Sequence, residues 1–136
     1  HLEPGLLDAV SRLKNLQWCS IVSHGRLSRL EYDSIIAKCD VGLDSLALDE
    51  EGLSQSSSFK TREMLASGLP VYSCHCDASF PANFKWYKTG QLNIQDIVDF
   101  AMANKNSSRI QIRTDSRLYI EKSVILKNFV SCFESL

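Results

Sequence analysis

A short polar stretch before a predicted helix carries the residues best suited to chemistry. In SSSFKTREMLASGLPVYSC, residues 56–74, three serines precede Phe59, and Lys60 and Glu63 lie about one helical turn apart. A helix N-terminus offers unpaired N–H groups and the positive end of the helix dipole. With the serine hydroxyls and the Lys60 ammonium, this end would bind phosphate, and the Glu63 carboxylate would accept hydrogen bonds from paired sugar hydroxyls.

The same residues also have a purely structural interpretation. Serines before a helix are common caps, and an exposed Lys60–Glu63 pair is worth only roughly 0.2–0.5 kcal/mol. Gly68 and Pro70 would then do no more than end the helix and start the next segment. Spacing alone leaves both interpretations open, so the surrounding elements have to be considered.

Hydrophobic periodicity and turn residues predict alternating helices and strands. Ser28 and Glu31 form a capping box at the start of one helix, and Gly68 ends another as its C′ residue. Helices are predicted over residues 4–15, 28–38 and 60–67, from 93, and from about 115, and strands over 18–23, 40–48 and 69–74. This order predicts an α/β fold, a Rossmann-like parallel sheet with helices on both faces.

In such sheets ligands bind at the carboxyl ends of the strands. That rule indicates the loops at 24–28, 45–58 and 75–91, and the serine stretch closes the second of them. We expect Asp44 to be solvated and Arg62 to be a surface arginine, with a phosphate contact as the alternative for Arg62. Trp86 and Tyr87 are expected to anchor the third loop, with stacking on a ligand as the alternative.

Composition excludes several classes of function. The 136 residues are 44% hydrophobic, enough for one globular domain, and 15 Lys and Arg balance 16 Asp and Glu without a basic run, so we expect no nucleic-acid partner. Five cysteines without a disulfide framework favour a reducing, cytoplasmic setting. The spacing in Cys74-His75-Cys76-Asp77 suits tetrahedral zinc poorly, so no metal is expected. No apolar run is long enough to span a membrane.

Two blocks of sequence resemble a known family. FKTREMLASGLPV resembles the K-x-x-E-x-x-A-x-G-x-P-V signature in the C-terminal, donor-binding domain of GT-B glycosyltransferases related to glycosyltransferase family 4. Upstream, SHGRLSRLEYDSIIAKCDVGLDSL resembles a second block of the same family, and Gly90 falls where the family places a glycine. The resemblance covers most of residues 23–105.

The resemblance implies that residues 1–136 are a single nucleotide-sugar-binding domain, a fragment lacking its first strand and an N-terminal acceptor domain. The fragment would act as part of a hexosyltransferase, inactive alone, with any peripheral membrane association through the missing part. No metal or other cofactor would be needed beyond the nucleotide-diphosphate sugar. Glu63 would hold the donor ribose. Lys60 would hold the diphosphate together with the N–H groups of Ser57, Ser58 and Phe59. The base or donor sugar would be contacted by His24, Gly25, Arg26, Leu27 and Gln55.

One departure from the family leaves alternatives open. Many members have a second glutamate eight positions before the ribose glutamate, where this chain has Gln55. An amide can hydrogen-bond but carries no charge and cannot act as a base. A non-catalytic nucleotide-binding or interaction module with the same fold, or a GT-B-type nucleotide-sugar epimerase, are therefore the alternative functions.

Overall fold

The computed structural model describes residues 20–46, 52 and 54–134, and the chain divides into two compact units, His1–Tyr32 and Asp33–Leu136. The helix expected over residues 4–15 lies outside the described part. The expectation of one domain over the whole chain stays a prediction.

The predicted capping box is confirmed at the start of α2 (Arg29–Ile36). The peptide N–H of Ser28 donates to the Glu31 carboxylate at 2.8 Å, and the Glu31 N–H donates back to the Ser28 hydroxyl at 3.4 Å. The strand predicted over 18–23 is wrong for its described residues, because 20–23 have no strand conformation. Strand propensity is local, but a strand forms only when a neighbour takes up its hydrogen bonds.

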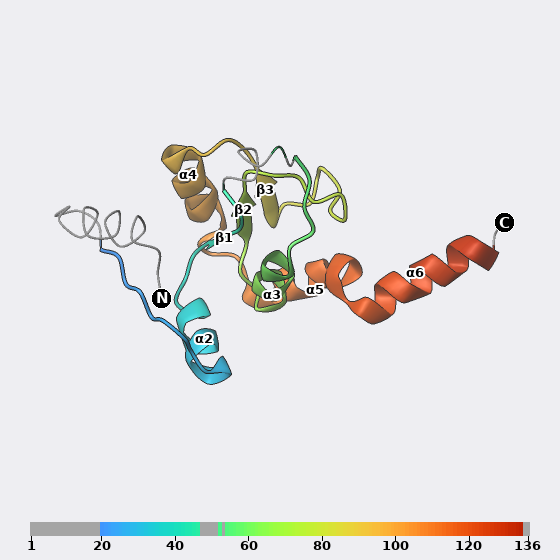
Figure 1. Cartoon of the computed structure of the whole chain (residues 1–136), viewed down its shortest axis with the longest axis horizontal. Helices are drawn as coiled ribbons and strands as arrows, with labels where there is room; N and C mark the ends of the chain where they lie inside the picture. The colour runs from blue at the N-terminus through green and yellow to red at the C-terminus, as the bar shows by residue number, and fades with distance from the viewer. Residues whose placement is uncertain (1–19, 47–51, 53, 135–136) are drawn as a thin grey trace. The chain divides into compact units, whose positions relative to one another are not determined.

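A three-stranded parallel sheet is the centre of the second unit (Figure 1). Its strands are β1 (Gly42–Leu43), β2 (Val71–Ser73) and β3 (Tyr87–Thr89), in the order β1-β2-β3. The prediction of a parallel α/β arrangement is confirmed at this level, and β2 falls inside the predicted strand 69–74. The described part of the strand predicted over 40–48 is shortened to two residues.

β3 corrects the prediction that residues 75–91 form a loop. Only three residues pair with β2, and the last two have exposed side chains, so no apolar alternation marked them as a strand. Trp86, directly before β3, is buried and donates its indole N–H to Asp115 at 2.8 Å, as expected of an anchor. Tyr87 is the first residue of the strand itself.

Helices cover both faces of this small sheet. Gly42 and Val71 are partners in the register and share a face, and a Cβ on Gly42 would collide with the sulfur of Met64 from α3 (Phe59–Ala66). On the other face, Phe100 of α4 (Ile94–Asn104) packs against Tyr72, with ring centroids 6.3 Å apart. Because Val71 and Tyr72 are successive residues of β2 and point to opposite faces, α3 and α4 lie on opposite sides of the sheet.

The prediction of one long helix from about 115 is wrong at its start and in its continuity. α5 (Arg109–Ile120) begins after Ser108, whose hydroxyl accepts from the Gln111 N–H, and α6 (Lys122–Glu134) follows it. Glu121 between them is extended, with ψ of 119°, and its carbonyl accepts from the N–H groups of Val124 and Ile125 in the first turn of α6. One residue thus ends α5 and starts α6. No helix in the described residues is long and apolar enough to cross a membrane.

Gly68 ends α3 as predicted, with φ of 77° in the left-handed region. The N–H of Leu69 reaches back to the carbonyl of Met64 at 3.0 Å, closing the helix. A Cβ on Gly68 would also lie 2.5 Å from the carbonyl oxygen of Arg109, because α5 packs against this end of α3. Two constraints, the backbone angle and the close contact, require glycine here.

Candidate functional site

The serine stretch lies at the carboxyl end of the sheet. Beyond β2, Gln55 forms a parallel bridge with Cys76, the Ser56 N–H donates to the Cys76 carbonyl at 3.0 Å, and the Cys76 N–H donates to the Ser54 carbonyl at 3.1 Å. The chain then turns at Ser58, the N-cap of α3, whose hydroxyl accepts from the Lys60 N–H at 3.2 Å. α3 therefore starts at the carboxyl end of the strands, which is where parallel sheets bind ligands.

Lys60, in the first turn of α3, lies beside a buried carboxylate. Its side chain is 54% exposed, and its Nζ is 3.7 Å from Oδ1 of Asp44, the residue directly after β1. The Thr61 hydroxyl donates to the other oxygen of Asp44 at 2.5 Å. The expectation that Asp44 is solvated is wrong, since it is only 4% exposed. A cation and a hydroxyl donor from α3 compensate the cost of burying it.

His75 approaches the same carboxylate from the loop after β2. Its Nε2 is 3.4 Å from Asp44 Oδ2, and its Nδ1 lies 2.8 Å from the Ser73 hydroxyl and 3.2 Å from the Ser45 carbonyl. The Tyr87 hydroxyl donates to the His75 carbonyl at 2.7 Å. In the sequence, His75 was considered only as a member of an unsuitable metal cluster. Its place directly after the predicted strand 69–74, at the carboxyl end of the predicted sheet, was the available signal.

Burial raises the pKa of Tyr87 to about 12, and the nearby carboxylates of Asp77 and Asp44 act in the same direction. The phenol is therefore neutral across the physiological range and serves as a fixed donor. It connects β3 to the His75 loop and adds no charge to the site.

Arg62 is not the surface arginine that was expected. Its guanidinium donates to Asp77 at 2.8 Å, to the Ser79 hydroxyl at 2.9 Å and to the Ser58 carbonyl at 3.1 Å, and its side chain is 19% exposed. Burial alone would raise the pKa of Asp77, but the hydrogen bonds from Arg62 and Ser79 lower the pKa below its usual value. Arg62 thus holds the loop after β2 against the start of α3.

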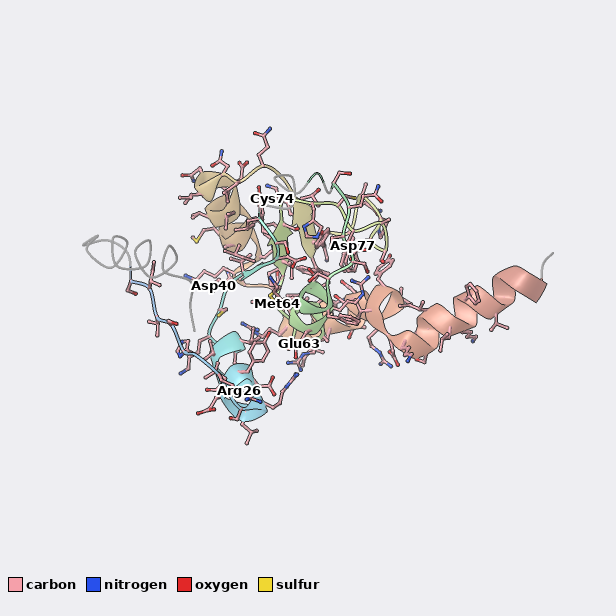
Figure 2. All side chains as sticks on the ribbon, viewed as in Figure 1. Arg26, Asp40, Glu63, Met64, Cys74 and Asp77 are labelled. Carbon is pink, nitrogen blue, oxygen red and sulfur yellow. The ribbon has the colours of Figure 1, made fainter. Side chains whose placement is uncertain are left out.

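Glu63 lies on the other side of α3, turned away from the strands, whereas Met64 faces them (Figure 2). The half-buried Glu63 lines a groove of about 710 Å³ between α3 and the α5–α6 junction. Lys60 and Glu63 therefore project from neighbouring parts of α3 toward different surroundings. The groove is lined by Phe59, Arg62, Glu63, Ala66, Arg113, Arg117, Ile120 and Glu121.

The remaining residues that are predicted to contact the ligand are mostly exposed, and four of them lie in the first compact unit. Ser57 and Gln55 are exposed, and Phe59 is 89% exposed at the first position of α3. His24, Gly25 and Arg26 are exposed and Leu27 is half-buried in the first compact unit, so their part in the site stays a prediction. Within the described residues, no three His, Cys, Asp or Glu side chains gather as metal ligands would.

Comparison of the chain with models of known families, with curated proteins and with solved structures gave no match. The resemblance to GT-B glycosyltransferases therefore rests on the two blocks of sequence around Glu31 and Glu63.

Proposed function

We propose that the chain is the donor domain of a GT-B glycosyltransferase, with a Rossmann-like fold, and that it binds a nucleotide-diphosphate sugar at the N-terminus of α3. The observation that carries the proposal is the position of this terminus at the carboxyl end of a parallel sheet, with the half-exposed ammonium of Lys60 in its first turn. The helix dipole and its unpaired N–H groups favour an anion there.

The diphosphate is held by Lys60 and by the backbone N–H groups of Ser57, Ser58 and Phe59. As the glycosidic bond opens, negative charge grows on the departing nucleoside diphosphate, and donors fixed in advance stabilise it. The sugar passes to an acceptor held by an N-terminal domain of the same protein. The charge is supplied by the protein, so the reaction needs no metal.

The ribose is held by Glu63, whose carboxylate lies in the wall of the groove beside α3. The groove volume of about 710 Å³ is within the range of small-molecule sites, roughly 300–1,000 Å³. Phe59 lines the same groove at the first residue of the helix, so the groove reaches the proposed diphosphate site. Gln55 provides a contact to the base or the donor sugar, and contacts from residues 24–27 stay an expectation from the resemblance.

The test is a titration of the full chain with UDP-glucose, GDP-mannose and ADP-glucose, followed by amide chemical shifts. One of the three should perturb the amides of residues 56–63. Lys60→Ala should weaken that ligand roughly 10- to 100-fold, because it removes a charge-assisted contact, and should leave the affinity for the matching nucleoside almost unchanged. Glu63→Gln should weaken both.

Lys105→Ala is the matched control, because Lys105 is an exposed lysine at the end of α4 and its removal should leave the affinity unchanged. Absence of any shift in residues 56–63 with all three ligands would exclude the donor site. An equal loss of nucleoside and nucleotide-sugar binding in Lys60→Ala would exclude the phosphate role of this lysine.

A further inference from the structure

The buried group beneath Lys60 contains two side-chain atoms without a hydrogen bond. Asp44 and His75 are 4% and 3% exposed, and Thr61 and Ser73 beside them are fully buried. Among the described residues, Asp44 Oδ1 and His75 Nε2 are buried side-chain atoms without a hydrogen bond. Buried polar atoms nearly always have a hydrogen bond, so a carboxylate oxygen and an imidazole nitrogen of neighbouring residues that both lack one require an explanation.

Both ring nitrogens of His75 lie beside oxygen atoms that can accept a hydrogen bond. Nδ1 is 3.2 Å from the carbonyl oxygen of Ser45 and 2.8 Å from the Ser73 hydroxyl, which also receives the His75 peptide N–H at 3.3 Å. Nε2 is 3.4 Å from Oδ2 of Asp44. A neutral ring carries a hydrogen on one of the two nitrogens, whereas a ring that carries both forms an ion pair with Asp44 and also donates from Nδ1.

The other charges near His75 are already balanced. Arg62 is paired with Asp77, and Tyr87 is neutral because its pKa is about 12. The Asp44 carboxylate then has two cations within reach, the Lys60 ammonium and a protonated His75. The charged and titratable groups around the imidazole are Lys60 and Arg62 on α3, Asp44 after β1, Cys74, Cys76 and Asp77 after β2, and Tyr87 on β3.

Lys60 is the more easily displaced of the two cations. Its side chain is half exposed and its Nζ is 3.7 Å from Asp44 Oδ1, beyond hydrogen-bond distance, whereas His75 is held by Ser73, Ser45 and Tyr87. An anion at the N-terminus of α3 competes with Asp44 for the same ammonium. If Lys60 moves to the anion, Asp44 loses its cation, and a buried carboxylate without a counter-charge is strongly unfavourable.

We propose that Asp44 and His75 are positioning residues that couple phosphate binding by Lys60 to the uptake of one proton. The inference rests on the proposed donor site. On binding, the Lys60 ammonium moves from Asp44 to the diphosphate, and the His75 imidazole takes a proton from the buffer acid and becomes the counter-ion of Asp44. In the free protein Asp44 holds Lys60 near the helix N-terminus, and in the complex His75 replaces it.

The direction of the pH effect follows from the proton count. The complex holds more protons than the free protein and ligand, so affinity rises as the pH falls, by up to about tenfold per pH unit for one proton. A donor site without this coupling would bind the fully ionised ligand with nearly constant affinity as the pH changes.

The experiment is calorimetric titration of the full chain with UDP-glucose, GDP-mannose and ADP-glucose at several pH values, each in buffers of different ionisation enthalpy. These ligands are suitable because their doubly esterified diphosphate has no group that titrates where imidazole does. The expected result is uptake of up to about one proton per ligand bound, with affinity falling as the pH rises. His75→Gln and Asp44→Asn should each abolish the uptake, and Asp40→Asn, at an exposed aspartate near the start of β1, should keep it.

The outcomes separate the two proposals. Binding of a nucleotide sugar without proton uptake by the unaltered chain overturns the coupling and leaves the donor site standing. Uptake that persists in His75→Gln overturns it too, because the proton then goes elsewhere. Failure of all three ligands to bind overturns the donor site and the coupling with it. Because the unaltered chain provides the first result, the test does not depend on the variants folding.

Discussion

Replacing Arg62 by Met tests whether the Arg62–Asp77 pair holds the loop after β2 against the start of α3. Methionine keeps an apolar stem of similar length over the Phe80 ring, which lies 5.8 Å from the guanidinium carbon, and removes only the charge and its donors. Asp77 is then left buried, with the Ser79 N–H at 2.9 Å as a remaining donor.

The expected loss of stability is about 3 kcal/mol at pH 7. Breaking a buried ion pair costs roughly 3–5 kcal/mol, and the lower end applies because Arg62 is 19% exposed and Ser79 still donates to Asp77. Against a total of roughly 5–15 kcal/mol for a typical protein, this loss is easily measured.

The loss should shrink on acidification. In the unaltered chain the pKa of Asp77 lies below its usual value, so the pair stabilises the fold above the unfolded pKa of about 3.9, and this contribution is lost as the pH falls through the folded pKa. In Arg62→Met, burial without the cation favours the neutral acid, so acidification relieves the penalty. Both effects reduce the difference between the two proteins at low pH.

Urea unfolding followed by tryptophan fluorescence at pH 7 and pH 4 measures the effect, since Trp86 is buried. A double-mutant cycle with Asp77→Asn isolates the pairwise part. Arg113→Met, at an exposed arginine on α5, is the matched control and should cost much less. A loss independent of pH, or one no larger than that of Arg113→Met, would refute the role given to the pair.

Two further changes test the fold around the site. Gly68→Ala should destabilise the protein by at least roughly 1–2 kcal/mol in urea unfolding, because the left-handed backbone is strained and the new Cβ meets the Arg109 carbonyl, whereas Ser67→Ala should change little. Tyr87 should ionise near pH 12 in an absorbance titration; because its folded pKa exceeds the unfolded value of about 10, stability should fall between about pH 10 and 12, and Tyr87→Phe should remove that part of the fall.

Elements controlled by local interactions could be predicted from the sequence. The Ser28–Glu31 capping box, the Ser58 cap and the Gly68 stop all act within one or two turns of their own helix, and the structure has each of them. The strand predicted over 18–23 is wrong for its described residues, 20–23, for the opposite reason. Its β-forming residues favour a strand locally, but a strand also needs a partner, and pairing is a property of the whole sheet.

The buried polar group around Asp44 and His75 could not be predicted from sequence patterns. Asp44 and His75 are 31 positions apart and become neighbours only because β1 and β2 are adjacent and α3 covers their carboxyl ends. A short polar residue beside a predicted loop is usually solvated, so burial is the exception that only the packing of α3 can reveal. Arg62 was misjudged on the same ground, because its partner Asp77 lies in the next loop along the chain.

The bridge between Gln55 and Cys76 makes the position at which α3 starts independent of the length of the segment before it. Hydrogen bonds from Ser56 to Cys76 and from Cys76 to Ser54 set the register of this strand-like extension independently of the intervening chain. A change in the number of residues between β1 and position 54 should therefore leave Ser58 and Lys60 in place. The start of α3 thus keeps its position through backbone hydrogen bonds to the loop after β2, in addition to the side-chain contacts of Arg62.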